Sequence, residues 1–111
     1  MPRDARVFLD DIVEACGKIE RYVEGLNLES FRSDGKTLDA VLRNLEVIGE
    51  AAKKLPPDIR SAMPDVEWQR IAGLRDILIH EYFGIDIEIV WDVVTTRVPA
   101  LRATVRRFLL G

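Results

Sequence analysis

Apolar residues recur at intervals of three and four over most of this chain, and this spacing constrains the fold more than any other feature. The first such series comprises Leu9, Ile12, Cys16, Ile19, Val23 and Leu26. On an α-helix these residues lie along one face, which must be buried against another element. Sustained two-residue alternation, the pattern of strands, does not occur. The spacing therefore predicts an all-α fold.

The repeat divides the chain into four long helices and one or two short ones. We expect long helices over about residues 5–26, 37–55, 67–82 and 87–110, a short helix at 58–63 and one helical turn inside a connector at 27–36. Pro56 and Pro57 end the second long helix, because proline lacks a backbone donor and disfavours helix in the preceding residue. Pro99 predicts a kink or short break near Thr95 and Thr96.

Several residues at the predicted helix ends fit known capping roles. Asp65 is expected to cap the third long helix and Asp86 the last one. Gly84 can adopt the left-handed conformation that ends a helix. Gly49 lies beside the apolar stripe of the second long helix, where the absence of a side chain would permit close helix approach. Together the elements predict an up-and-down helical bundle that forms a single domain over residues 1–111.

The size of the chain makes self-association useful. With 111 residues and 48% hydrophobic content, it fits one globular domain with a modest core. Such a domain buries only about two-thirds of the surface that its unfolded chain exposes, so a second copy would add to its stability. Charges interrupt the apolar runs well short of the ~18 residues of a membrane span. We expect a soluble, cytoplasmic protein with no membrane partner, and a homodimer is plausible.

The net charge of −3 excludes the general basic surface that many nucleic-acid-binding proteins carry. Any RNA contact must then come from a local cluster, and DNA is not an expected partner. Such a cluster lies near the C-terminus and comprises Arg97, Arg102, Arg106 and Arg107. Two interpretations stay open, a solvated helix face and a phosphate-contacting surface.

The residue types do not indicate a cofactor or zinc site, and a carboxylate-held magnesium site stays open although no acidic cluster favours it. One histidine and one cysteine cannot assemble a zinc site, and no glycine-rich phosphate loop is present. Asp10, Asp11 and Glu14 have the spacing of a solvated helix surface. Cys16 belongs to the first apolar series, so we expect it to fill the core in a reducing compartment.

The segment RDILIHEY at residues 75–82 holds the only histidine and sets an arginine into an apolar helical run. Arginine can bind a phosphate through two hydrogen bonds, and histidine gains or loses a proton near neutral pH. Arg75 and His80 could together hold and cleave a phosphodiester without a metal, with the 2'-hydroxyl of RNA as nucleophile. Burial of an unpaired cation is costly, so Arg75 must meet a ligand, a second subunit or a neighbouring acid, or must extend to solvent.

Helix geometry separates the groups of this segment. Arg75 and Tyr82 lie on one face, whereas His80 is about 140° away from Arg75 on a straight helix. Either the helix loosens near His80, or two copies face each other and each site mixes side chains from both, which we favour because the helix is apolar nearly all round. Asp76 precedes His80 by four residues and could fix its tautomer and raise its pKa. Alternatively, His80 only interacts with the helix dipole.

The segments NLEVIGEAAKKLPPDIR, WQRIAGLRDILIHEYFGID and IEIVWDVV closely resemble HepT-type proteins of the HEPN (higher eukaryotes and prokaryotes nucleotide-binding) superfamily. The resemblance spans nearly the whole chain and centres on an Arg-x-x-x-x-His-x-Tyr motif. It implies a homodimeric helical bundle whose motifs face each other across the interface. It also implies an RNase toxin of a type VII toxin–antitoxin system, with an MntA-type minimal nucleotidyltransferase as antitoxin.

The resemblance assigns roles to the motif residues. Arg75 would bind and polarise the phosphate, and His80 would shuttle protons during attack by the 2'-hydroxyl. Asp76 directly follows the motif arginine, at a position that is polar in the family, and we expect it to support the site without taking part in the reaction. Tyr82 would be the residue that the antitoxin adenylylates, which would bring charge and bulk into the phosphate site.

Two other functions stay open. The same arginines could hold a nucleotide or a nucleotidyltransferase without cleavage, in a nucleotide-binding or interaction module. The chain could also be a purely structural helical dimer.

Overall fold

The computed structural model describes residues 3–80 and 84–111, and every regular element in these two ranges is helical. The all-α prediction is confirmed. The elements are α1 (Arg3–Val23), α2 (Leu28–Arg32), α3 (Gly35–Lys53), α4 (Pro57–Ser61), α5 (Trp68–His80), α6 (Ile87–Asp92), the π-helix η2 (Val93–Arg97) and α7 (Val98–Leu110). The four long helices of the sequence prediction correspond to α1, α3, α5 and the continuous run from α6 to α7. No helix of the described residues is long and apolar enough to cross a membrane.

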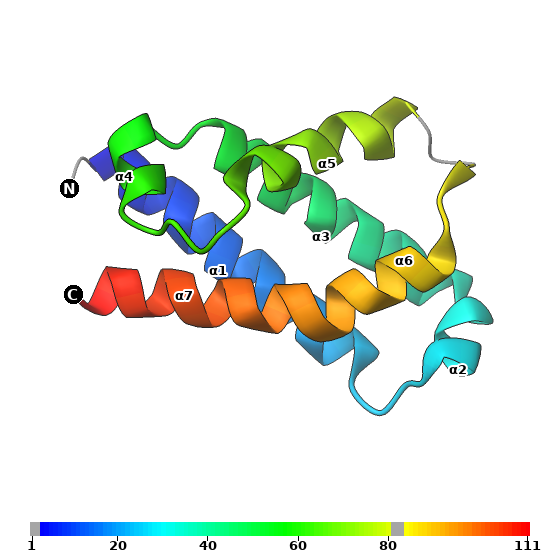
Figure 1. Cartoon of the computed structure of the whole chain (residues 1–111). Helices are drawn as coiled ribbons and strands as arrows, with labels where there is room; N and C mark the ends of the chain where they lie inside the picture. The colour runs from blue at the N-terminus through cyan, green and yellow to red at the C-terminus, as the bar shows by residue number, and fades with distance from the viewer. Residues whose placement is uncertain (1–2, 81–83) are drawn as a thin grey trace.

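The long helices run alternately in opposite directions, so that both chain ends lie at the same end of the molecule (Figure 1). Helix α1 packs on α3 and on α7, and α3 also packs on α5. The apolar series of α1 forms the centre of the core: Leu9, Ile12, Cys16 and Ile19 are completely buried. The predicted core role of Cys16 is confirmed, and burial raises the pKa of its thiol to about 12.

Side-chain caps define the connection between α1 and α3. Gly25 has a φ of 79°, which gives the left-handed turn after α1. Asn27 and Ser30 form a reciprocal capping box at the start of α2. Asp34 accepts hydrogen bonds from the backbone and hydroxyl of Thr37 at 3.0 and 2.7 Å, and these bonds lower the pKa of its carboxyl.

Of the predicted helix-end roles, that of Asp65 is wrong and that of Asp86 is confirmed. Helix α5 begins only at Trp68, three residues after Asp65, because the indole is buried and donates to Met63 O at 3.2 Å. Gly84 directly follows residues 81–83, which lie outside the described residues, so its role as a left-handed cap stays a prediction. Asp86 caps α6 as expected, accepting from the backbone of Glu88 at 2.9 Å.

The α-helix is interrupted before Pro99, at the predicted position, by a π-helical segment. The π-helix Val93–Arg97 separates α6 from α7, and the N–H of Val98 bonds to the carbonyl of Val93. Pro99 has no N–H to offer Thr95, which leaves the ordinary helical ladder incomplete here. The hydroxyls of Thr95 and Thr96 instead donate to backbone oxygens one turn earlier, at 2.8 and 2.6 Å.

Candidate active site

Arg75 lies on α5 where this helix crosses α3. Its side chain is 35% exposed, so it is neither buried in the core nor free in solvent. The crossing is unusually close at Gly49 of α3, since a Cβ added there would lie 3.0 Å from Arg75 N and 3.0 Å from Ile71 O. The close approach predicted for Gly49 is therefore confirmed. It places the backbone of Arg75 directly against α3.

The guanidinium of Arg75 forms an ion pair through Nε with Oε2 of Glu50, the residue after Gly49. The other carboxylate oxygen of Glu50 lies 3.5 Å from Lys54 Nζ. Glu50 lies outside the apolar stripe of its helix in the sequence, so the helical periodicity alone does not predict this contact. Glu50 directly follows Gly49, where close helix approach was expected, and this position was the one sign in the sequence that Glu50 could contact another helix.

Asp76 also contacts Arg75. Its Oδ1 lies 3.4 Å from Arg75 Nη1, and its Oδ2 lies 4.0 Å from Lys53 Nζ. Both carboxylate oxygens of Asp76 thus face cations. The structure brings Arg75 and Asp76 together, as the motif places them.

A polar pocket of about 270 Å³ opens beside Arg75. Helices α1, α3 and α5 supply its lining residues, which are Phe8, Asp11, Arg43, Glu46, Val47, Glu50, Ala51, Lys54 and Arg75. Three cations and three carboxylates share this pocket, so its wall carries both signs of charge.

The other two motif residues are His80, at the C-terminal end of α5, and Tyr82, two residues later in the sequence. His80 is the last residue of α5, and its side chain lies outside the described residues. Tyr82 lies outside the described residues altogether. The contact expected between Asp76 and His80 therefore stays a prediction.

The C-terminal arginines have separate surroundings. Arg97 pairs with Glu67 at 2.7 Å and Arg102 pairs with Glu20 at 2.8 Å. Arg107 donates to the hydroxyl of Thr104 at 3.3 Å, and Arg106 is exposed. Two of the four are thus engaged by carboxylates, which favours the interpretation as a charged helix surface for those two.

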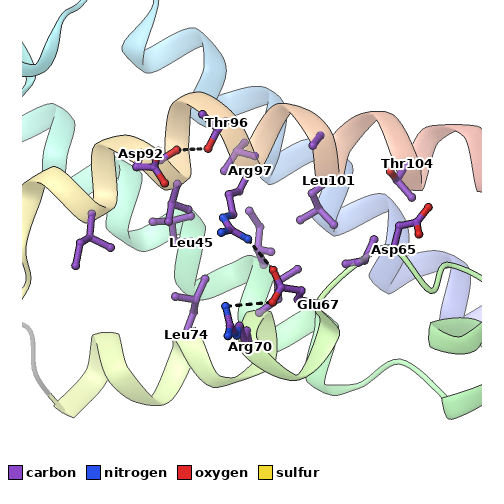
Figure 2. A pocket seen from close by; sticks show the side chains of 17 residues that line it. Leu45, Asp65, Glu67, Arg70, Leu74, Asp92, Thr96, Arg97, Leu101 and Thr104 are labelled. Atoms are coloured by element: carbon purple, nitrogen blue, oxygen red, sulfur yellow. Dashed lines mark hydrogen bonds and ion pairs between the residues drawn. The ribbon is translucent and has the colours of Figure 1, made fainter.

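A larger cavity, of about 740 Å³, lies between α3, α5 and the run from α6 to α7 (Figure 2). Leu45, Leu74 and Leu101 line its apolar wall, one from each of these parts of the bundle. Glu67 at its rim pairs with Arg97 and, at 3.1 Å, with Arg70. Of the motif residues whose side chains are described, neither Arg75 nor Asp76 lines this cavity. It is an apolar groove separate from the arginine site.

Within the described ranges, no three histidine, cysteine, aspartate or glutamate side chains are grouped so that they could hold a metal ion. The groups that the structure does gather at α5 are a guanidinium, its carboxylate partners and two lysines. This arrangement can present a positioned cation to an anionic substrate.

Several known proteins have sequences similar to this chain over most of its length. The chain is 41% identical to "Probable ribonuclease HepT" of Thermococcus cleftensis over 102 residues, which cover 92% of this chain and 93% of that protein. It is 49% identical to "Putative RNase MJ0127" of Methanocaldococcus jannaschii over 100 residues, covering 89% of this chain and 83% of the relative. No solved structure matches the chain.

The family described as ribonuclease HepT-like matches residues 12–108. This range runs from within α1 to two residues before the end of α7, and it includes Arg75, Asp76, His80 and Tyr82. The chain therefore belongs to the HepT-like ribonuclease family.

Proposed function

We propose that this ribonuclease is a metal-independent endoribonuclease toxin of a type VII toxin–antitoxin system, acting on cytoplasmic RNA. The observation that carries the proposal is the placement of Arg75. Its partly exposed side chain is paired with Glu50 of α3, and Arg75 itself lies on α5, the helix that ends at His80. A held, accessible cation near an acid–base group is what phosphodiester cleavage requires.

In the proposed reaction the 2'-hydroxyl oxygen of RNA attacks the adjacent phosphorus, and the bond from phosphorus to the 5'-oxygen breaks. A base removes the 2'-hydroxyl proton and an acid protonates the leaving 5'-oxygen, which yields a cyclic phosphate and a 5'-hydroxyl. His80 performs the proton transfers, and Arg75 stabilises the charge on the non-bridging oxygens. Asp76 supports the site through its contact with Arg75.

The site is proposed to be shared between two copies in a homodimer. Apolar surface next to the motif supports this, since Ile77 on α5 is 51% exposed and Ile89 on α6 is also exposed. A two-fold axis beside α5 would bring two copies of the motif face to face. Each composite site would then contain an arginine and a histidine in opposing positions, which overcomes their angular separation on one helix.

We propose that adenylylation of Tyr82 by an MntA-type nucleotidyltransferase silences the toxin. AMP adds a phosphate and a nucleoside two residues after His80. A covalently attached phosphate would compete with RNA for Arg75. A small nucleotidyltransferase in the adjacent reading frame would support this partnership.

The test is RNA cleavage by the purified protein in the presence of a chelator. Wild type should cleave, and His80→Ala should not, because the proton-transfer group is absent. Equal degradation by both preparations would show that the activity is contamination or that the site is assigned wrongly.

A nucleotide-binding module without catalysis is the second candidate. The pocket beside Arg75 favours it, because the cations Arg43, Lys54 and Arg75 that line it could hold a nucleotide phosphate without a proton-transfer group. AMP binding that persists in His80→Ala, with no cleavage by wild type and no toxicity on expression, would favour this module over the nuclease.

A further inference from the structure

We propose that Glu50 is a positioning residue for Arg75, fixing the direction in which the guanidinium meets a phosphate; the inference rests on the proposed nuclease function. Glu50 does not need to touch RNA in this role. It acts through Arg75, which it contacts by ion pairing across the α3–α5 crossing.

The edge of the guanidinium that Glu50 uses is the first argument. The contact is to Nε, at the base of the planar group. The two Nη groups lie at its far end, where arginine presents parallel donors to a phosphate. A carboxylate on the Nε edge therefore orients the plane. The Nη end also contacts Asp76, whose Oδ1 lies 3.4 Å from Nη1, but each Nη group has two N–H donors, so donors remain there for a phosphate.

The backbone supports the same geometry. Gly49 brings α3 within contact distance of Arg75 N and, at 3.2 Å from an added Cβ, of Arg75 Cβ. Because Glu50 follows Gly49 directly, one short segment of α3 sets both where the arginine side chain begins and how its head is oriented. Two independent contacts thus fix the two ends of the same side chain.

The charge of Glu50 would repel a phosphate if it were not shared. Its second oxygen lies 3.5 Å from Lys54 Nζ, so two cations flank one carboxylate. Stability is not the main effect of this pair, because Glu50 is 41% exposed and exposed pairs contribute about 0–1 kcal/mol. Restricting the rotamers of a flexible arginine before substrate arrives has a larger effect on the rate.

The kinetic experiment compares Glu50→Ala and Glu50→Gln with wild type on one RNA substrate. Glu50→Ala should lower kcat about 10-fold or more while KM stays within about threefold, since an interaction that serves the transition state is lost. Glu50→Gln keeps an oxygen that can accept from Nε and should fall between the two. A kcat for Glu50→Ala equal to or above that of wild type would overturn the proposal.

Glu14→Ala provides a matched control. Glu14 also pairs with a lysine four residues later, at the same 3.5 Å, but lies on α1 and contacts no arginine in any ion pair of the described residues. It should keep the wild-type kcat. An equal fall in both alanine variants would overturn the proposal, because the loss would then come from removing any surface ion pair.

A spectroscopic readout separates this inference from the proposed function. The Nε–H resonance of Arg75 in ¹H–¹⁵N spectra, assigned by its disappearance in Arg75→Lys, should shift and exchange faster in Glu50→Ala but not in Glu14→Ala. An unchanged resonance in Glu50→Ala would overturn the positioning role. If wild type cleaves no RNA, the nuclease proposal fails, while this resonance still decides whether Glu50 holds Arg75.

Discussion

Gly49 of α3 packs so closely on Arg75 of α5 that a Cβ at Gly49 would lie only 3.0 Å from Arg75 N, and the two helices would have to move apart by a few tenths of an ångström to accept it. The atoms in the way are a backbone nitrogen and a backbone oxygen, which cannot rotate aside as a side chain can. Helix α5, which carries the motif, can therefore pack this closely on α3 because residue 49 has no Cβ.

Gly49→Ala should destabilise the protein even though alanine is the better helix former. Separating the two helices costs about 1–3 kcal/mol, which outweighs the gain of up to about 1 kcal/mol in helix propensity. Gly73→Ala is the matched control, since Gly73 lies in α5 with nothing within 4 Å of an added Cβ. Urea unfolding should show a loss for Gly49→Ala and no loss for Gly73→Ala. A stabilised Gly49→Ala protein would show that the close contact is absent in solution.

Ile77→Glu should convert the proposed dimer to a monomer without unfolding it. A charge in the centre of an apolar interface must be desolvated on association, whereas at this half-exposed position it stays hydrated in the monomer. Val7→Glu on α1 is a matched control with a 48% exposed apolar side chain. Light scattering after gel filtration reports the mass, and circular dichroism reports the fold. A dimeric Ile77→Glu protein would exclude this face of α5 from the interface.

Tyr82→Phe should prevent adenylylation while leaving RNA cleavage intact, because only the phenolic oxygen is removed. Incubation with the cognate nucleotidyltransferase and ATP should add one or more AMP units to wild type, detected by intact mass. The chain has two tyrosines, so Tyr22→Phe is the natural control and should still be modified. Modification of Tyr82→Phe, or its loss in Tyr22→Phe, would reassign the acceptor.

Cys16 should make the protein less stable at alkaline pH. Burial raises the pKa of its thiol from 9.0 to about 12. Above pH 9 the unfolded chain loses this proton and the folded chain retains it, so the free energy of unfolding falls by up to about 1.4 kcal/mol per pH unit. Between about pH 8 and pH 10, wild type should lose about 1.4 kcal/mol more than Cys16→Val in urea unfolding. Parallel losses in both proteins would show that Cys16 does not titrate differently in the two states.

The helices could be predicted because their signal is local. The three-and-four spacing of Leu9, Ile12 and Cys16 requires only that one face be buried, and the core in fact buries all three. The effect of Pro99 is likewise local, because it interrupts the helix in which it lies, so the sequence alone could predict it. Asp65 failed as a cap because the start of α5 is decided by the burial of Trp68, a tertiary effect.

The surroundings of Arg75 could be predicted only in outline. The apolar stripe showed that this cation needs a partner, but the partner is on another helix, and no periodicity within α5 identifies it. Glu50 looks like a solvent-facing residue within the pattern of its own helix. Only the α3–α5 crossing, set by Gly49, turns it towards Arg75.

The π-helix at Val93–Arg97 lets the spacing of the buried residues differ from the 3.6 residues per turn of an α-helix. The buried residues Val90, Val94, Val98, Leu101 and Val105 average slightly more than the 3.6 residues per turn of an α-helix. A wider turn absorbs the excess, so that α6 and α7 both face the core. Losing one residue here would rotate α6 by about 100° relative to α7. This segment should therefore tolerate substitutions that preserve its length far better than it tolerates a deletion.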